Sequence, residues 1–467
     1  MRVRISGGVG TANGVVVPPG DKSISHRALL FASIANGTSQ ISNLSDGADV
    51  GATRRAIGLL GASVTTTTAP RGQLSTEEGS THVSADQWVT VEGCGLDGLH
   101  EPAGIIDVGN SGTLLRLLPG LLAGIDGAAV LSGDASVNER PVDRIIRPLT
   151  QMGASFDARR RGTVPPMWIR GGALRGIHYR TPVPSAQIKS AVLLAGLFAE
   201  GETVLSESTE TRPHTEEFFS LCEVPFDQSI DADGSRHVRI TRPDRVAPFF
   251  LTVPADPSQA AFWAVAAAIS PKGAVTLRTC YRGTSRAGYL DVLSAMGADV
   301  SRVPLGGEEL GLPREDVSVR WGPLRGVTFG GAFVSTMIDE IPILAVAACF
   351  AEGTSEFRDI GELRVKESDR IASTAAMLEA FGASVRTEAD ALIVSGSPEF
   401  VPSGALIDAH GDHRIAMAAA IMASRSPHEA IISGFESVAT SYVRFGADYE
   451  RLIGKEIESV PGESGAL

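Results

Sequence analysis

One pattern occurs six times along the 467-residue chain and limits the folds that are open to it. Each copy has a polar or glycine-containing start, an Ala/Leu-rich run of helical length, a polar turn and a short β-like run. The apolar runs start near Ser25, Gly112, Ala186, Ser258, Ile341 and His413. The period of roughly 70 to 85 residues is longer than that of common solenoid repeats, so each copy is expected to be a small α/β unit.

A second helix is expected in each copy, and most of these helices end in a Gly-Ala signature. The signature occurs in the segments that begin at Leu59, Gln151, Ser294 and Glu379. The third copy, from Phe218, lacks it, and the sixth copy is truncated near the C-terminus. The first helix of each copy is apolar nearly all round, as in residues 191–199 and 343–351. Such helices are buried, which predicts helices packed inside a shell of strands.

The first start, residues 18–30, reads PPGDKSISHRALL. Its two prolines stop the preceding element, and Gly20 permits a tight turn. Asp21, with Ser23 and Ser25, is suited to capping the helix that follows. A helix N-terminus that carries Lys22 and Arg27 would attract phosphate or carboxylate. A solvated capping box with incidental charges is the alternative at this point.

The other helix starts and two further clusters also carry chemically active side chains. They are Asn110–Thr113 with Arg116, Ser185 with Gln187, Asp339 with Glu340, Asp412–Arg414, Asn138–Pro141 and Arg364–Arg370. Each one alone could be an ordinary cap or a charged first turn. Their shared position at helix starts of one repeat favours an anion-binding cleft, because the positive ends of several helix dipoles would then point into the same cleft.

Composition restricts the partners of such a cleft. The chain is 43% hydrophobic and 20% charged, which is typical of a globular protein, and its length predicts two or more domains. The formal net charge of −13 argues against nucleic acid or an anionic membrane as the main partner. An anion site must therefore be a local basic pocket in an acidic protein.

The sequence also lacks the usual targeting and redox signals. The start MRVRISGG has no apolar core of a signal peptide, and the longest apolar runs, residues 260–269 and 341–351, are far shorter than the roughly twenty residues that span a bilayer. The four cysteines, Cys94, Cys222, Cys280 and Cys349, are far apart and form no CxxC pair. We expect reduced, mostly buried thiols in a cytoplasmic protein.

Three weaker motifs do not change this interpretation. Residues 93–98, GCGLDG, fit a dinucleotide-binding pattern, but no helix-like run follows, so they predict a turn. GDKS at Gly20 lacks the spacing of a Walker motif. His410 and His413 have no evident third ligand, so no metal site is expected.

The motifs GDKSISHRALL, GNSGT, NERP, SAQIKSAVLLAGL, MIDE-P, RVKESDR and GDHRIAM occur in this order. From about Gly14 to Tyr442 the chain resembles the 5-enolpyruvylshikimate-3-phosphate synthase family. The resemblance implies an α/β, two-domain, inverse α/β barrel-like enolpyruvyl transferase fold of six βαβαββ repeats, three per domain. It implies a continuous domain of residues 21–253 and a discontinuous one of residues 1–20 plus 254–467. The crossings near Gly20 and Val253 would be the hinges of a closing cleft.

The resemblance implies transfer of the enolpyruvyl group of phosphoenolpyruvate to the 5-hydroxyl of shikimate 3-phosphate, with release of phosphate. This reaction belongs to the shikimate pathway to chorismate and the aromatic amino acids. No metal or organic cofactor is implied. The expected partners are the two substrates and the inhibitor glyphosate, with no nucleic acid and no membrane, and a monomer is expected.

The family's site residues carry over onto matching positions. The catalytic set is Lys22, Asp339 and Glu367, in which Asp339 is the base for the 5-hydroxyl, Glu367 is the acid for the methylene carbon, and Lys22 assists at the leaving phosphate. Shikimate 3-phosphate would be bound by Lys22, Ser23, Arg27, Ser185, Gln187, Asp339 and Lys366. Phosphoenolpyruvate would be bound by Lys22, Asn110, Gly112, Arg140, Gln187, Arg370, His413 and Arg414.

Several positions depart from patterns seen in the family. Ala186 replaces one of two paired serines, His214 replaces a tyrosine, Glu362 replaces an asparagine, Thr440 replaces a lysine, and Tyr442-Val443 replaces an aromatic-proline pair. These changes resemble the branch that includes glyphosate-tolerant enzymes. Gly112, however, leaves room where an alanine would crowd glyphosate, so we expect sensitivity to this inhibitor.

Two other functions compete with this one. The UDP-N-acetylglucosamine enolpyruvyl transferases share the fold, but they would open with a Lys-Asn pair and carry a reactive cysteine on a mobile loop. In this chain the pair at the first helix start is Lys22-Ser23, and no cysteine is placed where a reactive loop cysteine is expected. A member that binds anions without turnover would be favoured by loss of Lys22, Asp339 or Glu367, and all three are present.

Overall fold

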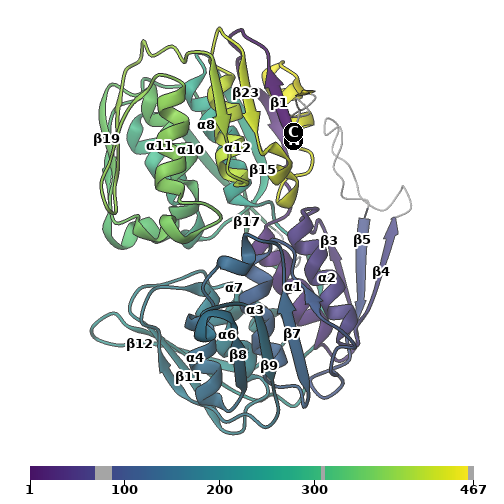
Figure 1. Ribbon diagram of the computed structural model, residues 1–467. Coiled ribbons are helices and arrows are strands. Elements are labelled where there is room, and N and C mark those ends of the chain that lie inside the picture. The colour runs from purple at the N-terminus through teal and green to yellow at the C-terminus, as the bar shows by residue number, and fades with distance from the viewer. Residues whose placement is uncertain (69–86, 307–310, 461–467) are drawn as a thin grey trace, which may run out of the picture. The chain divides into compact units, whose positions relative to one another are not determined.

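The computed structural model describes residues 1–68, 87–306 and 311–460 (Figure 1). Its internal contacts divide the chain into two units. The continuous unit is Gly20–Val253, to which Gly311 and Leu312 also belong. The split unit combines Met1–Pro19, Pro254–Gly306 and the chain from Pro313 on.

The described residues of the continuous unit form three four-stranded sheets of one topology. In each sheet the first two strands are parallel, and the remaining neighbours are antiparallel. The sheets are β14 (Phe250–Thr252)-β3 (Thr38–Ser42)-β5 (Gln87–Glu92)-β4 (Ser63–Thr68), β6 (Ile106–Asp107)-β7 (Ala128–Ser132)-β9 (Val164–Arg170)-β8 (Ser155–Ala158), and β10 (His178–Arg180)-β11 (Glu202–Glu207)-β13 (Arg236–Thr241)-β12 (Phe226–Ile230).

The split unit repeats this topology in three further sheets. They are β2 (Asn13–Val16)-β15 (Ala274–Tyr281)-β17 (Arg314–Arg320)-β16 (Asp299–Leu305), β18 (Thr328–Phe329)-β19 (Gly353–Phe357)-β21 (Leu392–Gly396)-β20 (Ser384–Thr387), and β22 (Ala405–Asp408)-β23 (Ala430–Ser433)-β1 (Arg2–Ile5)-β24 (Ile457–Val460). The predicted sixfold α/β repeat is therefore confirmed.

The sixth copy is complete, contrary to the prediction that it is truncated. Its second helix is α13 (Phe445–Ile453), and its last strand is β24. The third position of its sheet is filled from the other end of the chain by β1, which pairs with both β23 and β24. The sequence pattern missed this because the completing strand lies before the first copy.

The first helix of each copy begins where the polar starts predicted. These helices are α1 (Lys22–Ser33), α3 (Gly112–Leu122), α6 (Ala186–Gly196), α8 (Pro257–Ile269), α10 (Ile341–Cys349) and α12 (His413–Ala423). The second helices are α2 (Ala48–Leu59), α4 (Asp143–Met152), α7 (His214–Leu221), α9 (Gly288–Met296), α11 (Arg370–Ala380) and α13. The four-residue helix α5 (Arg159–Gly162) lies in the turn between β8 and β9.

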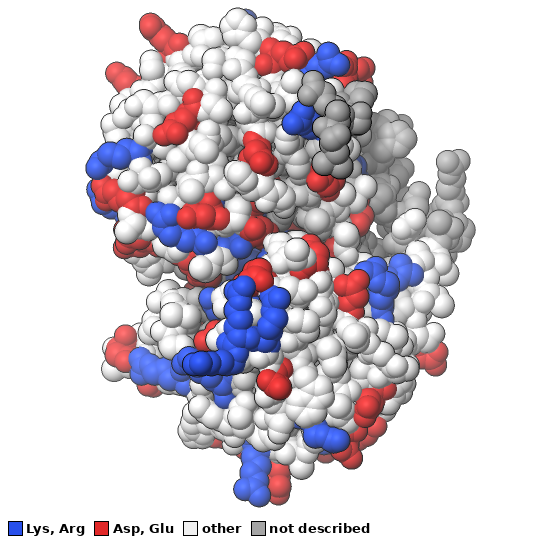
Figure 2. Space-filling view, in the orientation of Figure 1, with Lys and Arg blue, Asp and Glu red and all other residues white. Residues whose placement is uncertain are grey.

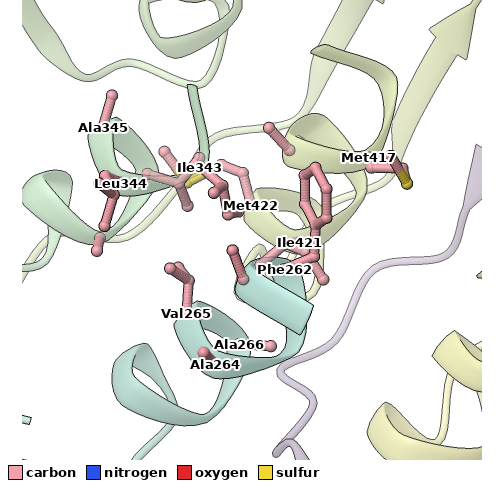
Figure 3. Packing of buried hydrophobic residues seen from close by; sticks show 14 of the residues in the cluster. Phe262, Ala264, Val265, Ala266, Ile343, Leu344, Ala345, Met417, Ile421 and Met422 are labelled. Carbon is pink, nitrogen blue, oxygen red and sulfur yellow. The ribbon is translucent and has the colours of Figure 1, made fainter. Parts of the chain in front are cut away.

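The core of the split unit lies among its three first helices. Every residue of α8, α10 and α12 is buried, and these helices pack against one another (Figure 3). Phe262, Leu344 and Ile421, one from each helix, belong to this cluster. The all-round apolar character of these segments is explained by this placement, since no face of such a helix contacts water.

Several smaller expectations can be compared with the structure. All four cysteines are free, and Cys222, Cys280 and Cys349 are buried, as predicted. Among the described residues, no helix has both the length and the apolar character needed to cross a membrane. The predicted loop at residues 71–80 lies outside the described residues. Of the predicted loop at 305–314, Leu305 ends β16 and Arg314 begins β17, and residues 307–310 lie outside the description.

Candidate active site

The start of α1 is capped by Asp21, whose carboxylate accepts a hydrogen bond from the Ile24 amide at 2.8 Å. Ser23 and Ser25, the other predicted caps, lie inside the helix. The Lys22 ammonium forms an ion pair with Asp49 at 3.0 Å and is largely shielded from solvent. The predicted helix start with a fixed cation is therefore present in the continuous unit.

Arg27 lies one turn further along α1 and is buried. Its guanidinium donates to the Ser23 hydroxyl at 2.6 Å, the Ser190 hydroxyl at 2.5 Å and the Thr215 hydroxyl at 3.1 Å. Burial lowers the pKa of Arg27 to about 10, although Glu216 opposes this shift. Arg27 therefore stays charged at neutral pH, and neutral hydroxyls from α1, α6 and α7 fix its orientation.

Two histidines surround this start. His26 is buried, with its Nδ1 2.6 Å from the Thr53 hydroxyl. Burial, together with the charges of Lys22 and Arg27, holds the pKa of His26 well below its usual value, so the imidazole is neutral at pH 7. His214, one of the predicted departures, places Nδ1 3.2 Å from the Ser23 hydroxyl.

The start of α3 adds a second basic group to the continuous unit. Ser111 caps the helix. Arg140 donates to the Asn110 side-chain oxygen at 2.9 Å, and the Asn110 amide donates to Asp134 at 2.6 Å. A Cβ atom on Gly112 would lie only 2.8 Å from Nη1 of Arg140. Asn110, Gly112 and Arg140 are therefore brought together, as the sequence predicted.

The start of α6 supplies the remaining predicted residues of this unit. Ser185 is the N-cap, with Gln187 in the first turn. The backbone carbonyl of Ala186, one of the expected departures, accepts from the Ser190 hydroxyl at 2.7 Å. Ser190 in turn accepts from Arg27, so Ala186 contacts Arg27 indirectly through its backbone. Next to it, buried Lys189 pairs with Glu207 at 3.0 Å and Glu216 at 2.7 Å, which joins α6 to α7.

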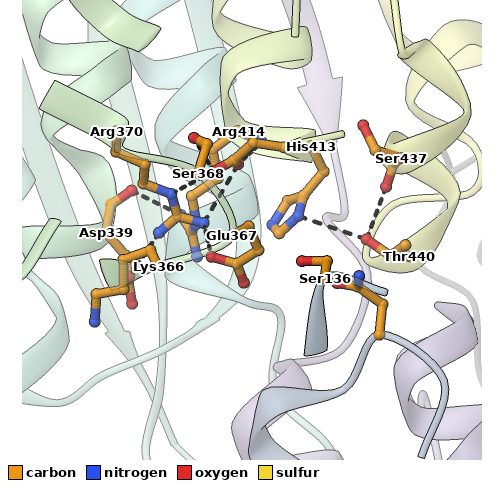
Figure 4. Close-up of polar contacts among 12 residues, drawn as sticks. Ser136, Asp339, Lys366, Glu367, Ser368, Arg370, His413, Arg414, Ser437 and Thr440 are labelled. Atoms are coloured by element: carbon orange, nitrogen blue, oxygen red, sulfur yellow. Dashed lines mark hydrogen bonds and ion pairs between the residues drawn. The ribbon is translucent and has the colours of Figure 1, made fainter. Parts of the chain in front are cut away.

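Arg370 is the centre of the predicted site in the split unit (Figure 4). Its buried guanidinium contacts Asp412 at 2.8 Å, Asp339 at 3.2 Å and Glu367 at 2.6 Å. Burial alone lowers the pKa of Arg370, but the three carboxylates outweigh burial and raise it above its usual value. One permanent cation thus holds the predicted base Asp339 and the predicted acid Glu367.

The start of α12 lies beside this cluster. Asp412 is the N-cap and accepts from the Arg414 amide at 3.0 Å. The Arg414 guanidinium donates to the Asp339 carbonyl at 2.9 Å and to the Glu340 carboxylate at 3.3 Å. His413 Nδ1 lies 3.5 Å from the hydroxyl of Thr440, one of the expected departures, which is a long contact.

Lys366 is the most exposed of the predicted cations in this unit. Its ammonium pairs with Glu362 at 3.1 Å. Glu362, another of the expected departures, therefore acts as a partner of Lys366. At partly exposed sites such i,i+4 pairs are worth only about 0.3–0.5 kcal/mol, so the pair can open for an anionic ligand.

Sequence reasoning missed several residues of these clusters. Asp412 was seen only as part of a motif, yet it caps α12 and binds Arg370. Arg116 was noted without a role, and it donates to the Gly112 and Pro141 carbonyls at 3.3 and 3.2 Å. An aspartate directly before His413-Arg414 is a local signal for a helix cap, so the capping role of Asp412 could have been predicted. Its ion pair with Arg370 has no local signal in the sequence.

The charge distribution agrees with local basic sites in an acidic protein. On the face in Figure 2, acidic and basic side chains are interspersed, and buried cations such as Arg27 and Arg370 contribute little to the surface. Within the described parts of the chain, no group of three or more His, Cys, Asp or Glu is arranged to hold a metal ion.

Comparisons with known proteins agree with this geometry. Residues 7–448 match the family model described as EPSP synthase (3-phosphoshikimate 1-carboxyvinyltransferase). The chain is 40% identical to the 3-phosphoshikimate 1-carboxyvinyltransferase of Geobacillus kaustophilus, covering 95% of the chain and 99% of that protein. It is 42% identical to the same-named protein of a Roseiflexus species, covering 92% of the chain and 95% of the relative.

Solved structures show the same similarity. EPSP synthase from Acinetobacter baumannii superposes with a TM-score of 0.81 at 34% identity, covering 98% of this chain and 100% of that one. The enolpyruvyl transferase NikO from Streptomyces tendae, at 18% identity and a TM-score of 0.72, covers 98% of this chain and 99% of its own, and supports the fold alone. From its sequence, its six-sheet fold and these matches, the chain belongs to the EPSP synthase family.

Proposed function

We propose that this protein transfers the enolpyruvyl group of phosphoenolpyruvate to the 5-hydroxyl of shikimate 3-phosphate and releases inorganic phosphate, a step of aromatic amino acid biosynthesis. The observation that carries the proposal is the Arg370 cluster, in which one buried guanidinium holds both Asp339 and Glu367. An acid and a base in fixed positions are what addition across the enol double bond requires. The names of the relatives favour this substrate over UDP-N-acetylglucosamine.

Glu367 is paired with Arg370 as a carboxylate. In the proposed addition, phosphoenolpyruvate replaces Glu367 as the partner of Arg370, and Glu367, then protonated, gives its proton to the methylene carbon C3 of phosphoenolpyruvate. The 5-oxygen of shikimate 3-phosphate bonds to C2, and its proton passes to Asp339. The product is a tetrahedral adduct whose C2 carries the methyl group, the carboxylate, the phosphate and the 5-oxygen of the cyclohexene ring. In the elimination, the C2–O bond to phosphate breaks, a methyl proton returns to Glu367, and Asp339 gives the proton from the 5-hydroxyl to the departing phosphate, which Lys22 stabilises.

The residues that we assign to substrate binding lie mostly at or near the helix N-termini described above. For shikimate 3-phosphate we assign Lys22, Ser23, Arg27, Ser185, Gln187, Asp339 and Lys366. For phosphoenolpyruvate we assign Lys22, Asn110, Gly112, Arg140, Gln187, Arg370, His413 and Arg414. The arginines suit this role because a guanidinium binds carboxylate or phosphate with two parallel hydrogen bonds. Helix N-termini add partial positive charge at the same places.

Three further properties belong to the proposal. Glyphosate inhibits the enzyme, because Gly112 has no side chain to crowd the inhibitor. The enzyme works in the cytoplasm, which agrees with four cysteines that remain free thiols. It acts as a monomer.

The test is phosphorus NMR of the purified protein with shikimate 3-phosphate and phosphoenolpyruvate, with Lys22→Met as the matched variant. We expect an inorganic phosphate resonance and a new enol ether product with the wild-type protein, and at least a hundredfold slower turnover with the variant. Loss of the Lys22 ammonium removes the charge that stabilises the leaving phosphate, and such electrostatic contributions are typically this large.

Other results would redirect the assignment. If shikimate 3-phosphate raised the melting temperature but no phosphate were released, the chain would be a binding protein without turnover, and Glu362 and Thr440 would be the residues to revert. If neither substrate bound, the proposed function would be wrong.

A further inference from the structure

Of the three first helices described in the split unit, α8, α10 and α12, only α8 has a start to which no ligand has been assigned. It nevertheless carries a buried polar network. Asp256, the N-cap, pairs with Arg286 at 2.7 Å, and both side chains are at most 5% exposed. Arg286 also donates to the Ser258 hydroxyl at 3.0 Å, and this hydroxyl donates to Glu340 at 2.5 Å.

The direction of these hydrogen bonds is determined by the donors and acceptors present. A guanidinium can only donate, so the Ser258 oxygen accepts from Arg286. The single hydroxyl proton of Ser258 is then directed at Oε1 of Glu340. The same oxygen accepts from Nη1 of Arg414 at 3.3 Å. Asp256, Arg286, Ser258, Glu340 and Arg414 therefore form one buried relay that links the start of α8 to the start of α12.

The relay ends at a residue of the proposed phosphoenolpyruvate site. Both contacts of Arg414 to Asp339 and Glu340 use Nη1, so the rest of the guanidinium can face an anion. We propose that Ser258 and Glu340 are positioning residues that fix the Arg414 guanidinium for phosphoenolpyruvate, an inference that rests on the proposed function. Arg286 and Asp256 hold Ser258 in the orientation that this task needs.

The physical reason is preorganisation. An arginine side chain has several rotatable bonds, and fixing it before the ligand arrives removes an entropic cost from binding. Two acceptors on one nitrogen restrict both the position and the plane of the guanidinium. Loss of the relay should therefore weaken ground-state binding of phosphoenolpyruvate and leave the proton transfers at Asp339 and Glu367 unchanged.

The experiment compares steady-state kinetics of wild type, Ser258→Ala and Glu340→Ala. We expect the KM for phosphoenolpyruvate to rise about tenfold in both variants, with kcat and the KM for shikimate 3-phosphate within twofold of wild type. Glu340→Gln keeps a carbonyl oxygen where Ser258 and Arg414 both donate, so it should restore the KM for phosphoenolpyruvate to within threefold of wild type. A residue of purely structural importance would not produce this selective change and rescue.

The matched control is Ser424→Ala. Ser424 is an equally buried serine at the opposite end of α12, where its hydroxyl donates to the Ile421 carbonyl at 2.6 Å. This variant should leave both KM values unchanged. Near-ultraviolet circular dichroism and melting temperature show whether each variant is folded, and Ser258→Ala, the mildest change, keeps the test decisive if Glu340→Ala does not fold.

Two failures can be told apart. If wild type turned over the substrates but Ser258→Ala left the KM for phosphoenolpyruvate unchanged, or changed kcat and both KM values equally, the relay would not position Arg414. If wild type itself released no phosphate, the proposed function would fail first.

Discussion

Gly112 controls where the guanidinium of Arg140 can lie. An added Cβ would sit 2.8 Å from Nη1 of Arg140 and 3.1 Å from Nη1 of Arg116. Both contacts are with the ends of flexible side chains, so the fold would persist while the two cations moved. The absence of a side chain at this position is therefore a property of the proposed ligand site and not of the helix.

Gly112→Ala should raise the inhibition constant for glyphosate by more than tenfold and the KM for phosphoenolpyruvate by less. The methyl group takes space that the longer inhibitor needs and also displaces Arg140. Inhibition kinetics against phosphoenolpyruvate measure both constants. An unchanged ratio of the two constants would show that the space at Gly112 does not govern sensitivity to glyphosate.

His26 predicts a pH dependence of stability. Its pKa in the folded protein lies well below 6.5. The unfolded chain therefore binds a proton near pH 6.5 that the folded chain rejects, and folding stability is lost as the pH falls below this value. The slope approaches about 1.4 kcal/mol per pH unit. Urea unfolding between pH 4.5 and 7.5 should show a flatter profile for His26→Gln.

The control for this experiment is His178→Gln, because the side chain of His178 is 76% exposed. That variant should keep the wild-type slope. Equal slopes for wild type and His26→Gln would mean that another group causes the acid sensitivity.

The residues of the site differ in how far sequence could predict them. Caps such as Asp21 and Ser111 are local, since each accepts from an amide three residues on. The sequence indicates Asp21 as a cap and places Ser111 at a helix start. The bond between Asp412 and Arg370 joins residues 42 positions apart, and the Ser258–Glu340 bond spans 82. Such pairs depend on how the repeats pack, which no local pattern encodes.

The strand β1 shows the same limit for elements. Its four residues, RVRI, alternate in burial as a strand should. Their partners, β23 and β24, are made at the other end of the chain, so the sequence pattern indicated a truncated sixth copy. The helices were easier to predict, because their apolar runs and caps are continuous in sequence.

Ile5→Ala should destabilise the split unit by about 2–5 kcal/mol, because Ile5 is fully buried and the truncation leaves a cavity in the core. Val15→Ala, on β2, is the control, because Val15 is 53% exposed and should change stability by less than about 0.5 kcal/mol. Denaturant unfolding of both variants measures the difference. Equal costs would show that β1 does not stabilise its sheet through core packing.

The two units differ in how the chain builds them. All three sheets of the continuous unit come from residues 38–252, including β14 at its end. The split unit needs β1 and β2 from the first twenty residues to complete two of its sheets. The units are therefore similar in topology but unequal in their dependence on distant segments.

A fragment of residues 20–253 should fold by itself, whereas a fragment of residues 254–467 should not. The second fragment lacks the third strand of one sheet and an edge strand of another, and it exposes the apolar surfaces that they cover. Co-expression with residues 1–19 should restore protection against proteolysis. A cooperative melting transition of the 254–467 fragment alone would contradict this expectation.

The position of β1 also has a consequence for biosynthesis. Residues 2–5 are translated more than four hundred residues before their pairing partners β23 and β24. At typical elongation rates this delay is about 20 to 80 s. During this time the continuous unit can complete its sheets on the nascent chain, whereas the N-terminal strand must wait unpaired. The last sheet of the split unit can therefore close only after β24 has been translated.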